Sequence, residues 1–343
     1  MRFKITITMA FIFIMSVIFI YIYTQKQEIR LSGAYKALNF WTDSRAYPNK
    51  DISKDAQYKA FAKQRTQLQK TASLSADDTV AVWKNMGPDN VPGRMISLAV
   101  NPQNSNTLYA GSASGGLWRT HQSSTGANWQ RITTGYPVLG VMAIAIDPVD
   151  TNNIYIGTGE VYGYQKSIGG TVIRTTRGSY GIGILKSEDG GATWSKSLDW
   201  TEDQQRGVQV IEINPLNNQS IYAGTSEGLY KSTDGGMNWT LKLDKLMVQD
   251  IVIHTDDTSK VIVSCGNLGS TGTGLYRSLD AGENWSFING LPAYSGKTLI
   301  EMHRDNPNLV YASVADSVTS IGLYKTSNFG SNWVKIHGAD VQR

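Results

Sequence analysis

One eight-residue pattern recurs along the second half of the chain and limits what the chain can fold into. Ser or Thr opens the pattern, Gly stands fifth and Trp closes it; SEDGGATW, STDGGMNW and SLDAGENW end at Trp194, Trp239 and Trp285. A fourth copy, TSNFGSNW, ends at Trp333 and carries Asn328 where the others carry Asp. The closing tryptophans are about 45 residues apart, which is the repeat length of four-stranded propeller blades. The repeat therefore predicts a propeller.

Every repeat contains short strands in the same order. In the third repeat, an apolar run at 208–213 is followed by a turn, a second run ending at Gly224, a third run at 228–232, the octet, and a last run beginning at Trp239. Alternating apolar residues between turn residues are typical of antiparallel strands. We therefore predict an all-β propeller over residues 79–343. Its five recognisable four-stranded blades are expected near 96–134, 142–200, 208–244, 250–290 and 299–337.

The octet is expected to be a hairpin loop between the third and fourth strands of a blade. Gly supplies positive φ, the Asp carboxylate accepts backbone N–H groups across the turn, and Trp packs against its neighbours. The first unit reads QSSTGANW at 122–129 and has lost its Asp. We predict structural rather than catalytic roles for Asp189, Trp194, Asp234, Trp239, Asp280, Trp285, Asn328 and Trp333.

The first residues of the chain indicate its compartment. After Arg2 and Lys4, residues 5–24 carry no charge and are long enough, at about 20 residues, to cross a bilayer as a helix. Secretory peptides have a shorter apolar core and a small-residue cleavage site, for which 32–34 is the only candidate. The pattern favours a signal anchor at 1–25, with a cleaved signal peptide as the alternative. Either one sends the remainder out of the cytoplasm, and the anchor makes a membrane the first expected partner.

A helical stalk or linker is predicted for residues 26–78. The stretch 52–71 is rich in Ala, Lys and Gln and has a thin apolar stripe. The propeller would follow directly after this segment.

Several classes of function are not expected. The net charge is only +4 and no run of Lys or Arg marks a nucleic-acid groove. Cys265 lies in the apolar run 261–265, where a buried inert thiol is expected rather than a nucleophile. The four histidines lack metal-ligand spacing and no Gly-rich phosphate loop opens a helix, so we predict neither a metal nor a cofactor.

The octets resemble Asp-boxes, the repeats shared by sialidases, xyloglucanase-type glycoside hydrolases and sortilin-like propellers. Longer stretches at 83–94, 109–118, 154–160 and 174–184 are similar to exported sortilin-like or BNR-repeat "glycosyl hydrolase" propellers common in Bacteroidetes. Many of those proteins end in a type IX secretion sorting domain. The resemblance covers roughly residue 46 to the end and implies a fold and an extracellular address rather than an activity. Asp-box rings usually have six or more blades, so five units predict an incomplete ring.

Loops at one end of the blades are the expected place for function. The loops after the second strands and between blades share one face, whereas the octets lie on the other. The long insert 160–181 brings aromatic rings and guanidinium groups to that loop-rich face, a combination that suits sugars, peptides or anionic groups. The alternative is that the insert covers the central channel. The ligand-binding candidates are Tyr162, Tyr164, Arg174, Arg177, Tyr180 and Arg206.

A hydrolase is the rival function. The resemblance implies that xyloglucanase-type enzymes carry a catalytic Asp in a Thr-Asp-Val-Gly-Gly stretch, which here reads SASGG with Ala113 in its place. An inverting hydrolase needs two carboxyl groups, so this departure counts against that activity. The resemblance to sialidases implies an Arg in a Phe/Tyr-Arg-Ile-Pro motif at the start of the ring. Arg94 lies at about that place, but this sequence lacks the flanking Phe and Pro. The remaining acid candidates are Glu160, Glu202, Asp203 and Glu227.

No spacing among these acids selects a pair. The favoured function is therefore an extracytoplasmic sortilin-like module that binds or scaffolds glycan or protein ligands through its loop-rich face. The alternative is a carbohydrate-active glycoside hydrolase, xyloglucanase- or sialidase-like, with an acid pair on the same face.

Overall fold

The chain divides into two compact units, Met1–Ser53 and Lys54–Arg343, and the second contains the sheets. The expected signal anchor at 1–25 lies outside the described residues, and no described helix has the length and apolar character to span a membrane. The computed structural model describes residues 40, 44, 47–48, 53, 55–72, 93–126, 128–138, 140–166, 172–176, 178–203, 205–316 and 319–338.

One long helix precedes the sheets, in the range expected to be helical. α3 (Ala56–Ala72) belongs to the second unit. Arg65 donates a hydrogen bond from Nη1 to the Gly135 carbonyl at 2.9 Å, and the Lys196 ammonium lies 4.8 Å from the Tyr58 ring centroid. These contacts join the helix to the first two blades.

Within the described residues, the strands form five four-stranded sheets and one two-stranded sheet. Each four-stranded sheet is antiparallel and corresponds to one predicted unit, so we number them blades 1 to 5 in chain order. The blade strands are β1 (Met95–Asn101), β2 (Asn104–Ser112), β3 (Leu117–Thr120) and β4 (Gln130–Ile132); β5 (Val141–Ile146), β6 (Ile154–Thr158), β9 (Gly183–Ser187) and β10 (Ser195–Asp199); β11 (Val208–Ile213), β12 (Ile221–Thr225), β13 (Gly228–Ser232) and β14 (Thr240–Leu243); β15 (Val248–Ile253), β16 (Val261–Cys265), β17 (Gly274–Ser278) and β18 (Ser286–Phe287); β19 (Thr298–Met302), β20 (Val310–Ala315), β21 (Ser320–Thr326) and β22 (Val334–His337).

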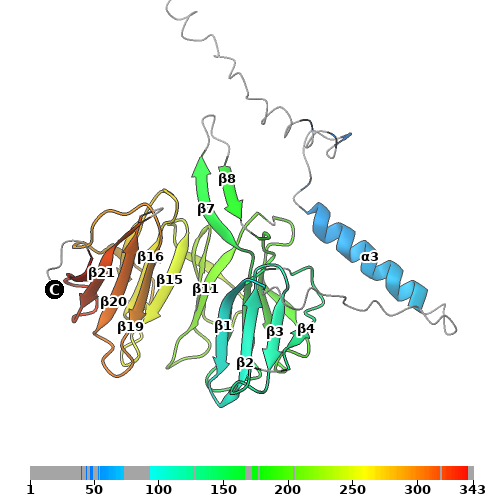
Figure 1. The fold of residues 1–343 in the computed structure, drawn as a ribbon, viewed down its shortest axis with the longest axis horizontal. Coiled ribbons are helices and arrows are strands. Elements are labelled where there is room, and N and C mark those ends of the chain that lie inside the picture. The colour runs from blue at the N-terminus through cyan, green and yellow to red at the C-terminus, as the bar shows by residue number, and fades with distance from the viewer. Residues whose placement is uncertain are drawn as a thin grey trace, which may run out of the picture. The chain divides into compact units, whose positions relative to one another are not determined.

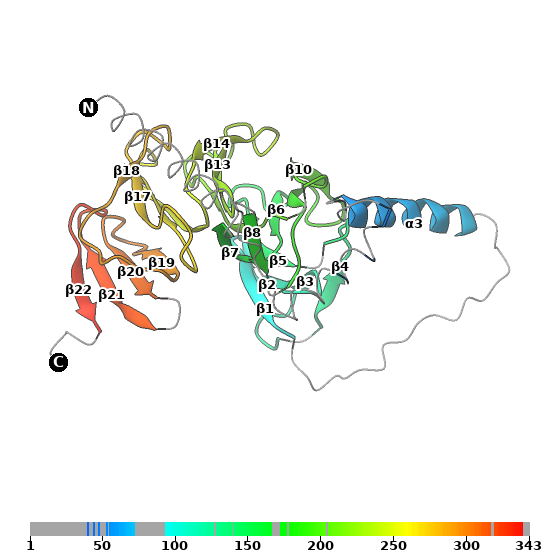
Figure 2. The ribbon, with the colours of Figure 1, turned by 90° about the horizontal axis from the view of Figure 1, so that it is seen from above.

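The blades stand side by side in chain order, as Figure 2 shows from above. Their first strands, β1, β5, β11, β15 and β19, contact one another in sequence. No comparable contact leads from β19 back to β1 among the described residues. The described blades therefore form an open series.

Neighbouring blades enclose separate apolar cores. Between blades 1 and 2, Tyr109 and Leu117 pack with Ile154, Ile156 and Trp194. Comparable clusters fill the three following junctions. Burial of these alternating side chains is the main stabilisation that holds the blades together.

The octets join the third and fourth strands, and the fourth strands begin one residue after Trp rather than at it. In the second blade, Asp189 accepts hydrogen bonds from the backbone N–H and the hydroxyl of Thr193 at 2.8 and 2.6 Å, and Ser187 donates to it at 2.8 Å. These bonds to the charged form lower the pKa of Asp189 to about 2, and similar bonds act on Asp234 and Asp280. Asn328 keeps the same accepting geometry with its amide oxygen, which explains why Asn can replace Asp there.

The first octet is longer than the sequence prediction allowed. Thr120 pairs with Leu108 as Ser187 pairs with Ile154, so the loop begins at Thr120 and not at Gln122. Gln122 then occupies the Asp position, and its side-chain oxygen accepts a hydrogen bond from Asn128 at 2.9 Å. The prediction of 122–129 was wrong because it assumed a loop of eight residues, whereas this loop has two more.

Each octet is also bound by the preceding blade. A Tyr on the second strand, a Lys or Arg on the third, or both, donate to the carbonyl at the fourth octet position of the next blade. The bonds are Tyr109 and Arg119 to Gly190, Tyr155 to Gly235, Tyr222 and Lys231 to Ala281, and Arg277 to Phe329. We call these contacts the octet locks.

Candidate functional site

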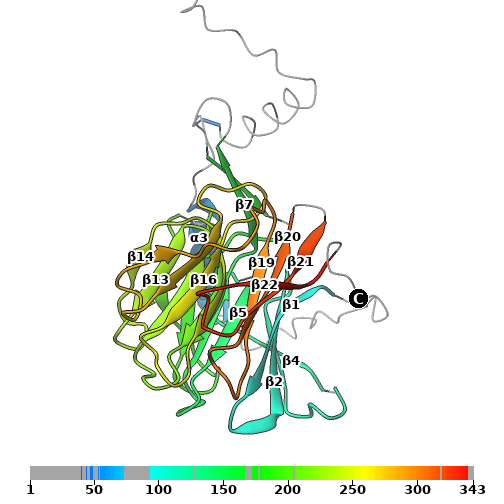
Figure 3. The same cartoon turned by 90° about the vertical axis from the view of Figure 1, so that its left-hand side faces the viewer.

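The long insert of blade 2 folds into a hairpin of its own. β7 (Val161–Lys166) and β8 (Val172–Thr176) pair between β6 and β9 in the chain, and Figures 1 and 3 show the hairpin extending beyond the ends of the blade strands. Asn267 of blade 4 donates to the Tyr162 carbonyl at 2.7 Å, and Gln209 of blade 3 donates to the Val161 carbonyl at 2.7 Å. The base of the hairpin therefore reaches from blade 2 across blade 3 to blade 4.

Arg174 holds the hairpin to blade 3. Its guanidinium binds both oxygens of Glu227 at 2.8 Å and lies 5.0 Å from the Tyr164 ring centroid. The bond to Glu227 raises the pKa of Arg174 above its ordinary value. Tyr180 donates its hydroxyl to the Arg174 carbonyl at 2.7 Å and keeps 41% of its surface exposed. Of this group, the Tyr180 ring is the surface presented to solvent.

Glu160 is locked in a second arginine clamp. Its side chain is fully buried, and Arg94 binds both carboxylate oxygens, with 2.6 Å between Nη2 and Oε2. Gly178 closes over the pair, since a Cβ there would lie 2.7 Å from Oε2. Ala113 is buried beside this clamp and donates its N–H to the Arg94 carbonyl at 3.0 Å. A carboxylate held in this way is a structural anion with no open side for a substrate.

The remaining predicted residues lie apart from these two clamps. Asp203 pairs with Arg206 at 2.7 Å, and the Arg206 guanidinium lies 5.2 Å from the Trp200 ring centroid. Glu202 is exposed, and Arg177 lies outside the described residues. The structure thus brings each of Glu160, Asp203 and Glu227 to an arginine rather than to one another.

A second set of acids, which sequence reasoning missed, lines the inner strands. Glu212 on β11, Asp250 on β15 and Glu301 on β19 border one cavity of about 270 Å³. Glu212 is exposed along this groove, and its carboxyl lies beside the strands that border the cavity. Desolvation and the charges of Asp250 and Glu301 raise the pKa of Glu212 to about 8. The pKa of Asp250 is raised by desolvation to about 6, although the backbone N–H of Ile300 donates to its carboxylate at 2.9 Å.

Because of Glu212, the free energy of unfolding should fall as the pH rises. Its carboxyl keeps a proton in the folded chain up to about pH 8, whereas an unfolded chain releases it near 4.5, so stability declines between these values. Glu212→Gln should therefore melt at a higher temperature than the parent at pH 8 and show little difference at pH 4. Thermal melting across this range checks the expectation, with Glu188→Gln, an exposed carboxylate, as the matched control. A Gln variant that follows the parent at every pH would contradict it.

The described residues contain one cysteine and no cluster of possible metal ligands. No three His, Cys, Asp or Glu side chains gather there in a way that would hold a metal ion. Cys265 is fully buried in β16, and burial raises the pKa of its thiol far above the ordinary value. Its position is that of an inert core residue.

The blades, their order and their cores define a β-propeller. No family model matches the chain. The sequence is 26% identical over 157 residues to a xyloglucanase of Hypocrea jecorina, covering 43% of this chain and 17% of that protein. The fold resembles the crystal structure of the Niastella koreensis GH74 enzyme, with TM-score 0.52, 19% identity, and coverage of 70% of this chain and 38% of that one. It also resembles an ancestral GH74 enzyme, with TM-score 0.55, 19% identity, and coverage of 74% and 32%.

The chain thus spans less than two fifths of the length of these relatives. Similarity at 19% identity concerns the fold alone.

Proposed function

We propose that this chain is an extracytoplasmic β-propeller that binds a polysaccharide of the xyloglucan class at its loop-rich end. The observation that carries the proposal is the hairpin β7–β8, which is tied to blades 3 and 4 and places Arg174 between Tyr164 of the hairpin and Tyr180 of the segment after it. Aromatic rings held in fixed positions suit stacking on the apolar faces of sugars, because little side-chain entropy is lost on binding. The sequence similarity to a xyloglucanase supports a glycan as the ligand.

Binding is favoured over cleavage at this end of the blades. Glu160 and Glu227 each accept two hydrogen bonds from one arginine, and Asp203 pairs with Arg206. A general acid must be free to reach the substrate with its proton, whereas these carboxylates are already bound by guanidinium groups. Ala113 supplies no carboxyl group where the resemblance implies one.

The apolar run at 5–24 supports a location outside the cytoplasm, with the membrane anchor as the first form of that proposal and a cleaved signal peptide as its alternative. The octets and the longer motifs support membership of the exported, sortilin-like Asp-box propellers. A protein ligand is the second class that the same aromatic surface would suit.

The binding proposal predicts different effects from two changes at Tyr180. Tyr180→Ala removes the exposed ring and should weaken binding of soluble xyloglucan roughly five- to tenfold. Tyr180→Phe keeps the ring and should retain most of the affinity. Calorimetric titration with xyloglucan measures both, and Met237→Ala, an exposed residue of the third octet, is the matched control. A parent chain that binds no polysaccharide, or an Ala variant that binds as tightly as the parent, contradicts the proposal.

Glycoside hydrolysis is the second candidate, and the inner-strand acids favour it. Glu212 and Asp250 border one cavity and have pKa values raised to about 8 and about 6, as an acid and base pair at neutral pH would require. Release of reducing sugar from xyloglucan that disappears in Glu212→Gln and persists in Glu160→Gln would favour this candidate over simple binding.

A further inference from the structure

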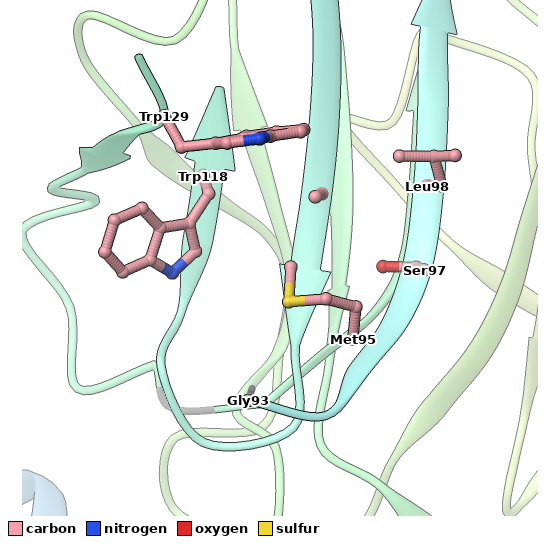
Figure 4. Close-up of a pocket in the computed structure, with 7 residues that line it drawn as sticks. Gly93, Met95, Ser97, Leu98, Trp118 and Trp129 are labelled. Carbon is pink, nitrogen blue, oxygen red and sulfur yellow. The ribbon is translucent and has the colours of Figure 1, made fainter. Parts of the chain in front are cut away.

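The outer face of blade 1 carries an apolar groove. Figure 4 shows Met95 and Leu98 on β1 opposite the indole rings of Trp118 and Trp129, around a cavity of about 420 Å³. Leu98 keeps 66% of its surface exposed. Apart from Ser97, the residues that line the groove carry no polar group that faces solvent as a charge, and most are apolar. A surface of this kind marks an interaction site.

The groove on blade 1 corresponds to the surface by which a later blade packs against the blade before it. The described blades form four such junctions. Leu98 pairs with Ala110 across the β1–β2 ladder, as Ile211 pairs with Ala223 in blade 3 and Ile300 pairs with Ala312 in blade 5. Ile211 and Ile300 are buried against the preceding blade. Trp118 pairs with Ala110 on β2, as Tyr230 pairs with Ala223 in blade 3 and Tyr324 pairs with Ala312 in blade 5. Each of these aromatic residues follows a Leu that is buried or half-buried. The groove therefore has the side chains that receive a preceding blade.

Blade 5 carries the other half of the same junction. Tyr311 on β20 pairs with Lys325 on β21, as Tyr222 pairs with Lys231 in blade 3. Tyr222 and Lys231 both donate at 2.7 Å to the Ala281 carbonyl of the next octet. Among the described residues, no further octet follows blade 5 to receive the corresponding bonds.

The octet of blade 1 has the matching acceptor. The Ser123 N–H donates to the Asn106 carbonyl, as Gly190 donates to Asn152 and Ala281 donates to Ser259. Ser123 is therefore at the fourth octet position, whose carbonyl is the acceptor in the octet locks. No described blade precedes it.

We propose that two copies of this chain pack head to tail, with blade 5 of one copy on blade 1 of the other. Tyr311 and Lys325 donate to the Ser123 carbonyl, and the apolar groove is filled by the neighbouring sheet. A second copy is the occupant because its end face carries a Tyr and Lys pair like the one that Tyr222 and Lys231 form at the junction of blades 3 and 4, so the contact continues an interface already present. Such a contact joins two different surfaces, and it closes a ring or continues to further copies. The proposal does not depend on ligand binding.

The first test measures the protein mass of the full chain in mild detergent by sedimentation over a range of concentrations. The parent should form dimers or larger assemblies. Leu98→Glu blocks the groove and Lys325→Glu blocks the donor face, so each variant alone should be monomeric, whereas their mixture should form a one-to-one dimer. Leu216→Glu, at an equally exposed leucine in the β11–β12 turn, should behave as the parent. A monomeric parent, or a mixture that stays monomeric, overturns the proposal.

A cross-link tests the contact itself and does not require the Glu variants to fold. Cys265 is the one native cysteine and is fully buried, so introduced thiols can be assigned without ambiguity. Copies with Ser123→Cys should form a disulfide with copies carrying Lys325→Cys, and neither should cross-link with its own kind. Three outcomes overturn the proposal. The first is a disulfide within one chain of a double variant that carries both Ser123→Cys and Lys325→Cys. The others are cross-linking among identical copies and protection of Leu98 by residues 73–92 of the same chain.

Discussion

Trp194→Ala should destabilise the second unit by about 3–5 kcal/mol, the cost of removing a large aromatic side chain from a packed core. The Trp194 ring is 9% exposed and packs with Tyr109, Ile154 and Ile156 at the junction of blades 1 and 2. Its indole N–H also donates to the Gly191 carbonyl at 3.1 Å. The change therefore opens a cavity between blades and removes one bond of the octet. The midpoint of urea unfolding measures the loss.

Trp129→Ala is the matched control for this change. Trp129 closes the first octet as Trp194 closes the second, but it is 36% exposed because no described blade covers it. Its replacement should cost about 1 kcal/mol or less in dilute protein. Equal losses at the two positions would show that the octet tryptophan acts within its own blade and not at the junction.

Arg94→Met should be the most damaging change at the loop-rich end. Glu160 is fully buried and Arg94 is its charged partner, so the variant leaves a buried carboxylate without its guanidinium. Glu160→Gln should cost much less, because an amide can still accept a bond from Arg94 and carries no charge. The double variant Arg94→Met/Glu160→Gln should be more stable than Arg94→Met alone, since the stranded charge is gone.

Melting temperatures of the three variants and the parent complete this cycle. A double variant no more stable than Arg94→Met would mean that Arg94 acts through packing rather than through the charge of Glu160. Glycan binding should persist in Glu160→Gln, because the proposal gives that carboxylate no contact with the ligand.

The strand order of the blades could be predicted because the octets repeat it. Each closing Trp marks the boundary before a fourth strand, and the alternating runs before it align from unit to unit. The hairpin β7–β8 had a local signal too, since the runs 161–166 and 172–176 flank a Gly-Gly pair. Because the insert lacked counterparts in the other units, it was interpreted only as a loop.

The contacts that shape the candidate site could not be predicted in this way. Arg174 and Glu227 are 53 residues apart, and their pairing depends on how far the hairpin leans over blade 3. Glu212, Asp250 and Glu301 lie on three different first strands, and the packing of blades 3, 4 and 5 brings them to one cavity. Such contacts depend on the angle between blades, for which single-sequence patterns carry no signal.

The octet locks bear on how proteins of this kind change over evolutionary time. Each junction uses a Tyr, a Lys or Arg, or both on one blade and the carbonyl at the same octet position on the next, although the octets themselves have diverged to Asn328 and Gln122. After a blade is duplicated or deleted, the blades that become neighbours therefore already have matching junction surfaces. Blade number can drift by unequal recombination while every remaining junction stays intact, and the gain of a binding hairpin in one blade leaves the others unaltered.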